Sequence, residues 1–263
     1  MIIINVKKVE YMKRKNKIFI SLALICGVMI SSLMMKNRST EVFLNITEEQ
    51  PIFRVEREDK SISLTIDINW AETDYLYSIL EVLDKYNVKG TFFIMGGWVN
   101  YTPENKEKLL KIYKEGHEVA SHSYIHPIFT KIGKDRIKEE LDKTDKIIEE
   151  TIGIKPKLFR FPSGEYNEQS FNTVTTLGYK CIQWDADSVD WKQLGSEVEY
   201  QRVMKKVKPG SILLFHNNAK YTPDNLDRII NKLQADGYNF IPVGDLIYNE
   251  NYYIDETGEQ RKK

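Results

Sequence analysis

The chain has 263 residues, enough for one medium-sized catalytic domain and a short leader but not for two enzymes. Its 38 Lys and Arg residues balance 38 Asp and Glu residues, so the overall charge does not favour nucleic acid or another highly charged partner. Two cysteines, Cys26 and Cys181, are too few for a disulfide framework. We interpret Cys181 as a small buried hydrophobic residue.

Residues 18–35 form an uncharged apolar run that is long enough to cross the hydrocarbon core of a membrane. A basic cluster at residues 13–17 precedes it, which predicts that this end stays in the cytoplasm. We therefore expect residues 1–38 to hold a cytoplasmic segment and one N-terminal transmembrane helix, with the rest outside the cell membrane. A cleaved signal peptide, and hence secretion, is the alternative, but no A-x-A pattern ends the run. Ile25 is also too large to precede a lipid-modified Cys26.

After a mixed, polar stretch at residues 39–60, which suits a linker, strand patterns alternate with helix patterns. Strands are expected at residues 61–66, 91–95, 118–120, near 158, and at 179–183, 211–215 and 240–242. Helices are expected over residues 75–86, 105–115, 134–151, from 168, and over 223–236. This alternation predicts an α/β fold, with a parallel sheet closed or nearly closed into a barrel. We place the catalytic domain at residues 61–250 and a polar C-terminal tail at 251–263.

Polar residues follow the predicted strands, at the end where barrel enzymes build their active sites. These residues are Asp67, His122, His126, Arg160, Asp190 and His216. The remaining histidine, His117, stands at a strand start and is interpreted as an ordinary polar residue.

Each of these residues has a chemical and a structural interpretation. His122 and His126 form an H-x-x-x-H pattern that suits Zn²⁺ or another divalent metal, although two surface histidines at this spacing are common. Asp67 follows an apolar strand, and it is either a general base or one half of a buried ion pair with Arg160. His216 is either an acid tuned by a carboxylate or a core histidine with satisfied hydrogen bonds.

The sequence resembles the polysaccharide deacetylase family, carbohydrate esterases that share the nodulation-deacetylase homology domain. The resemblance covers about residues 62–246, and five motifs occur in the family's order. They are residues 65–67 for T-F-D-D-G, 121–126 for H-[ST]-x-x-H, 160–164 for R-x-P-[FY]-G, 187–191 for D-x-x-D-W, and 213–216 for L-x-x-H. The residues around Asp67 and His216 are most similar to the sporulation-associated branch that acts on peptidoglycan.

The resemblance implies a distorted (β/α) barrel, a cell-wall glycan substrate and a divalent metal, usually zinc, with cobalt or manganese as alternatives. It assigns the metal to His122 and His126, the base to Asp67 and the acid to His216. It also implies that Arg160 orients the base and that Asp190 tunes the acid. Three further residues are implied to contact the substrate: the backbone N–H near Ser163 at the oxyanion, and Trp191 and Leu214 at the acetyl group.

One motif residue departs from the family pattern. The second Asp of T-F-D-D-G would be the third metal ligand, and this chain has Ile68 there. Direct ligation by Asp67, the amide oxygen of Asn69, or added water are the alternatives for that position. In addition, Ser163 replaces the aromatic residue of R-x-P-[FY]-G.

Two hypotheses for function follow. The chain is an active N-deacetylase, as the set Asp67, Arg160, Asp190 and His216 favours. Alternatively it is a weak or inactive glycan-binding member with an envelope or sporulation role, as Ile68 favours.

Overall fold

The computed structural model describes residues 50–263, in which no helix is long and apolar enough to span a membrane. The predicted anchor, Cys26 and most of the predicted linker lie outside these residues. Cys181 is a free, buried cysteine, and burial raises the pKa of its thiol well above its usual value. Its environment agrees with the interpretation of a small hydrophobic residue.

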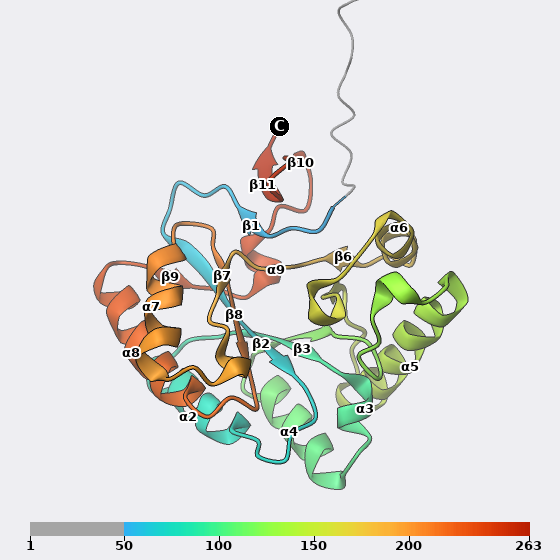
Figure 1. Ribbon diagram of the computed structural model, residues 1–263, viewed down its shortest axis with the longest axis horizontal. Coiled ribbons are helices and arrows are strands. Elements are labelled where there is room, and N and C mark those ends of the chain that lie inside the picture. Colours follow the sequence, from blue (N-terminus) through green and yellow to red (C-terminus); the bar gives the residue numbers. More distant parts are fainter. Residues whose placement is uncertain (1–49) are drawn as a thin grey trace, which may run out of the picture. The chain divides into compact units, whose positions relative to one another are not determined.

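A curled parallel sheet of eight strands forms the centre of the described domain (Figure 1). Along the sheet the strands are β6 (Lys180–Cys181), β5 (Leu158–Phe159), β4 (Glu118–Ser121), β3 (Thr91–Ile94), β2 (Ser61–Ile68), β8 (Ile212–His216) and β7 (Ala186–Asp187), with β9 (Asn239–Phe240) also paired to β2. This half-barrel confirms the expected α/β class and is consistent with the distorted (β/α) barrel.

Helices pack on the outside of the sheet, and their positions follow the predicted ones closely. They are α2 (Leu76–Lys85), α3 (Gly96–Val99), α4 (Pro103–Lys114), α5 (Lys134–Ile152), α6 (Glu168–Thr176), α7 (Ser196–Lys206), α8 (Thr222–Ala235) and α9 (Val243–Leu246). In α8, Leu226, Ile229, Ile230 and Leu233 recur at helical spacing and are all buried. The helix α7, the short helices α3 and α9, and the 3₁₀ turns Phe129–Lys131, Pro162–Gly164 and Asp190–Lys192 were not expected.

The central strand β2 is buried on both faces, as is usual in parallel sheets. Ile62, Leu64, Ile66 and Ile68 belong to the largest apolar core, which the helices share. Because side chains alternate along a strand, Thr65 and Asp67 point to the opposite face. This alternation decides which residues at the end of β2 can take part in chemistry.

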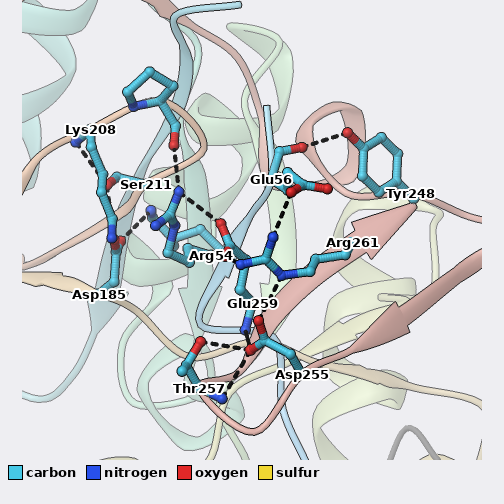
Figure 2. A network of polar contacts seen from close by, with 12 residues as sticks. Arg54, Glu56, Asp185, Lys208, Ser211, Tyr248, Asp255, Thr257, Glu259 and Arg261 are labelled. Carbon is cyan, nitrogen blue, oxygen red and sulfur yellow. Dashed lines mark hydrogen bonds and ion pairs between the residues drawn. The ribbon is translucent and has the colours of Figure 1, made fainter. Parts of the chain in front are cut away.

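The structure differs from the expected polar tail at residues 251–263. Strands β10 (Tyr252–Ile254) and β11 (Glu259–Lys262) pair with β1 (Arg54–Val55) in a second, three-stranded sheet. Figure 2 shows the polar network around it, in which Arg261 contacts Asp255 at 2.7 Å and Glu56 at 2.5 Å. Both strands are short, β11 consists of charged and polar residues, and its partner β1 lies about 200 residues away in the chain, so the local sequence pattern did not reveal this sheet.

Candidate active site

Asp67 and Arg160 form a buried ion pair at the carboxyl ends of β2 and β5. Asp67 is 3% exposed, and its Oδ1 lies 2.7 Å from Nη1 of Arg160. Arg160 also donates to Thr65 Oγ1 at 2.8 Å and to the carbonyl of Gln183 at 3.0 Å. Burial alone would raise the pKa of Asp67, but the charge of Arg160 and of the nearby imidazoles holds it below its usual value. The group is therefore a carboxylate whose position is fixed by the guanidinium.

His122 faces this carboxylate from the end of β4. Its Nδ1 lies 2.9 Å from the carbonyl of Arg160, which makes Nδ1 the protonated nitrogen and leaves the lone pair on Nε2. Nε2 in turn lies 3.5 Å from Oδ2 of Asp67. The ring of His126 is 4.9 Å from that of His122, centroid to centroid. The structure thus brings the two histidines of the H-x-x-x-H pattern together.

Both imidazoles are held in the neutral form that metal ligation requires. Burial lowers the pKa of His122 to about 4, despite the opposing effect of Asp67. Burial also lowers the pKa of His126. His126 has a positive φ of 59°, and its N–H donates to Oγ of Ser123 at 3.0 Å. A non-glycine residue in this conformation persists only where its surroundings hold it, and such residues are frequent at functional sites.

A residue that sequence reasoning missed holds the loop between the two histidines. Oε2 of Glu140, on α5, accepts hydrogen bonds from the N–H groups of Tyr124 at 2.8 Å and Ile125 at 2.9 Å. Glu140 is fully buried. It lies on the buried face of α5, between Ile137 and Leu141. A carboxylate in the apolar stripe of an amphipathic helix was the available signal, since a buried charge requires partners.

His216 and Asp190 form the third part of the site. Nδ1 of His216 lies 2.7 Å from Oδ1 of Asp190, and Oδ2 of Asp190 accepts from the backbone N–H of His216 and from Thr222 Oγ1. Burial would lower the pKa of His216, but the charge and hydrogen bond of Asp190 outweigh it and raise the pKa. His216 is paired directly with Asp67 in the β2–β8 ladder. An imidazolium is therefore stabilised next to the carboxylate of Asp67.

Comparisons with known proteins identify the family of the chain. A family model described as polysaccharide deacetylase matches residues 54–182. The peptidoglycan-N-acetylmuramic acid deacetylase PdaA of Bacillus subtilis is 33% identical over 196 residues, which is 73% of this chain and 73% of that protein. The chain belongs to the polysaccharide deacetylase family.

Two other proteins are similar over comparable lengths of this chain. The protein YlxY of Bacillus subtilis is 34% identical over 78% of this chain, which spans only 63% of that protein. The crystal structure of BA3943, described as a CE4 family pseudoenzyme from Bacillus anthracis, has a TM-score of 0.71 and 36% identity, and the match covers 76% of this chain and 69% of that one. A mutant of BA3943 is described as having restored enzymatic activity.

Ile68, which stands where the deacetylase motif has an Asp, lies away from the site. Its side chain is fully buried in the apolar core with Leu76 and Ile79, on the opposite face of β2 from Asp67. It can therefore neither coordinate a cation nor contact the site. The donor set is partial: two neutral imidazoles suit a divalent cation, and Oδ2 of Asp67 lies 3.5 Å from Nε2 of His122. Among residues 50–263, no group of three or more His, Cys, Asp or Glu side chains is arranged to hold a metal ion.

The three predicted substrate contacts lie near this set. Leu214 is buried in β8, two residues before His216 and on the same strand face. Trp191, which follows Asp190, is 57% exposed. Ser163 has a positive φ of 57° in the turn after Arg160, and the carbonyl of Gly164 accepts from Gln183 Nε2 at 3.0 Å. Their contacts with an acetyl group remain a prediction.

Proposed function

We propose that this protein is a metal-dependent N-deacetylase that removes acetyl groups from peptidoglycan or a related N-acetylhexosamine polymer. The observation that carries the proposal is the complete acid–base set, in which the carboxylate of Asp67 and the Asp190-paired His216 stand opposite each other on adjacent strands. A protein that only binds glycan has no need of this arrangement. The relatives named as peptidoglycan deacetylases support the same substrate class.

In this proposal the residues divide the hydrolysis of an amide between them. Asp67, kept ionised by Arg160, takes a proton from the attacking water as general base. His216, kept protonated by Asp190, gives a proton to the departing amine, which is a poor leaving group without it. Backbone N–H groups near Ser163 would stabilise the developing oxyanion, and Trp191 and Leu214 would contact the acetyl group. A cation held by His122 and His126, zinc or alternatively cobalt or manganese, would supply Lewis acidity.

We also propose that the apolar run at residues 18–35 anchors the protein in the cell membrane, which would put the domain outside the cytoplasm with the cell-wall glycan. Membrane fractionation and N-terminal sequencing of the mature protein test this topology. A mature N-terminus after residue 35 would contradict the anchor and indicate a cleaved leader. The sporulation role remains a proposal that rests on the motif residues around Asp67 and His216.

A second candidate function is glycan binding without efficient hydrolysis, and Ile68 favours it. A fully buried aliphatic side chain replaces a ligand, so cation affinity should be low. The description of BA3943 as a pseudoenzyme is consistent with this candidate.

Acetate release decides between the two functions. The protein with Zn²⁺, Co²⁺ or Mn²⁺ should release acetate from N-acetylglucosamine oligomers or peptidoglycan, and His122→Ala should not. Because position 68 faces the apolar core, Ile68→Asp requires the end of β2 to turn toward the site; it should then bind the cation more tightly and react faster, and the lost core packing should lower its stability. Ile68→Asn is the matched control, since Asn has nearly the same shape as Asp without the negative charge. No acetate from the wild type with any of the three metals would exclude the deacetylase and leave the binding function.

A further inference from the structure

A cavity of about 810 Å³ lies near the end of β2, the strand that carries Asp67. It lies between the segment after β2 and the helices α3 and α4, and ten residues line it. Trp70 and Tyr101 are 42% and 74% exposed, whereas Trp98 is buried beneath them. The volume is in the range of small-ligand sites, which are usually concave, aromatic and furnished with a few polar groups.

The cavity is adjacent to the proposed active site along two segments of the chain. Trp70 is three residues after Asp67, so their Cα atoms are at most about 11 Å apart. The edge of its indole lies against Gly97, where an added Cβ would be 2.8 Å from Cζ2 of the ring and 2.6 Å from the carbonyl of Tyr124. Tyr124 belongs to the loop between the two histidines. Gly97 therefore lets both the indole and the histidine loop pack tightly on α3, and it links the aromatic wall to the site.

The charged residues of the cavity select for the charge of a ligand. Lys108 is 8% exposed and lies 3.1 Å from both Asp74 and Glu104, so its positive charge is already paired. Glu72 adds another carboxylate to the lining. Three acidic residues against one lysine leave the cavity net negative, which disfavours an anionic group and favours a neutral or cationic one.

We propose that this cavity is a sugar subsite that binds a neutral or amino-bearing hexosamine residue next to the one that reacts. The C–H faces of a pyranose pack on aromatic rings such as Trp70 and Tyr101, and the carboxylates accept hydrogen bonds from its hydroxyl and amino groups. A glucosamine residue that has already lost its acetyl group carries a positive charge and fits the cavity best. The proposal rests on the glycan substrate of the proposed function, and it predicts a preference for partly deacetylated chains.

Binding measured without turnover tests the subsite. Calorimetry on the full chain in detergent, with EDTA present, would use the N-acetylglucosamine tetramer and the glucosamine tetramer as probes. Trp70→Ala and Tyr101→Ala should each weaken binding about tenfold, in line with the loss of an anchoring aromatic residue. Tyr113→Ala is the control, since Tyr113 is a partly exposed tyrosine of α4 that does not line the cavity. Affinities equal to the wild type in both cavity variants would overturn the subsite.

A separate binding comparison tests the preference of the cavity for a positively charged sugar. At low salt the glucosamine tetramer should bind several-fold more tightly than the acetylated one, and Glu72→Gln should narrow the difference. Equal affinity of the wild type for both tetramers would overturn the preference. Acetate release with added cation separates this inference from the proposed function. Cavity-dependent binding without acetate contradicts only the enzyme, whereas acetate release with unaltered binding in both cavity variants contradicts only the subsite.

Discussion

Arg160 reaches across the end of the sheet from β5 to Asp67 in β2, and the two charges lie 2.7 Å apart with almost no exposure to water. Removing one partner of a buried pair leaves an uncompensated charge. Arg160→Met should therefore lower the free energy of unfolding by about 3–5 kcal/mol and raise the pKa of Asp67, with loss of acetate release at neutral pH. Urea unfolding and a pH–rate profile measure both effects.

Arg160→Lys is the matched variant, since it keeps the charge but loses the planar fork that also contacts Thr65 and Gln183. It should retain most of the stability and only part of the activity. If Arg160→Met were as stable as the wild type, the ion pair would not stabilise the fold as its burial indicates.

Asp190 raises the pKa of His216 through its charge and a 2.7 Å hydrogen bond. Asp190→Asn should lower that pKa, so the alkaline limb of the rate profile should move to lower pH. An NMR titration of the His216 ring measures the shift directly and does not depend on activity. Thr222→Val, which removes one hydrogen bond to Asp190 but leaves its charge, should shift the pKa much less.

The same pair makes stability depend on pH in a defined direction. Because the folded-state pKa of His216 is raised, its contribution is fully present below the unfolded value of about 6.5 and is lost as pH rises through the folded pKa. Asp190→Asn should abolish this loss of stability with rising pH. An unchanged pH dependence in the variant would show that another group is responsible.

Glu140 positions the loop between His122 and His126 through two backbone N–H groups. Glu140→Ala should weaken cation affinity about tenfold or more, as changes in groups that orient metal ligands commonly do. Calorimetric titration with Zn²⁺ measures it. Glu140→Gln retains an acceptor oxygen and should be milder, and Glu139→Ala, at the exposed neighbouring position, is the control. If Glu140→Ala bound Zn²⁺ with wild-type affinity, Glu140 would not position the histidine loop for metal binding.

Two buried histidines should make the metal-free protein sensitive to acid. Burial lowers the pKa of both His117 and His122 to about 4. Between the unfolded value of about 6.5 and about pH 4, the unfolded chain binds more protons than the folded one, so stability falls as pH falls. Each histidine should contribute at most about 1.4 kcal/mol per pH unit.

Urea midpoints measured with EDTA across this window test the acid sensitivity. His117 lies at the opposite end of β4 from His122, and His117→Asn keeps an acceptor for the N–H of Gly90, so this variant should remove part of the slope. A slope that is unchanged in this variant would contradict the assignment to His117.

The C-terminal sheet allows exposed and buried interactions to be compared. Gln260 is fully buried, and its amide pairs with both backbone groups of Tyr248 at 2.8 Å. Gln260→Ala should cost about 1–3 kcal/mol, because it removes two hydrogen bonds from the part-buried backbone of Tyr248, whose carbonyl retains a 3.4 Å contact from Lys180 Nζ. Arg261→Ala breaks three partly exposed ion pairs and should cost less than about 1 kcal/mol. Thermal or urea unfolding decides the order, and the reverse order would contradict this interpretation of the C-terminal sheet.

The sequence by itself determined the parallel α/β class, the family and the residues from which a site could be built. These depend on local signals: strand alternation around Asp67, helical spacing in α8, and five short motifs in order. It also showed that Ile68 stands where the family motif has an Asp, since that is a question of residue type at one position.

Only the tertiary structure decided how these residues combine. Arg160 meets Asp67 across 93 positions, Glu140 holds a loop from another element, and the C-terminal strands pair with residues near position 54. The cavity of Trp70 and Tyr101 likewise joins a loop to two helices. Local periodicity states which face of an element is buried, but the partner on that face depends on the path of the whole chain, so contacts between distant segments leave no local pattern.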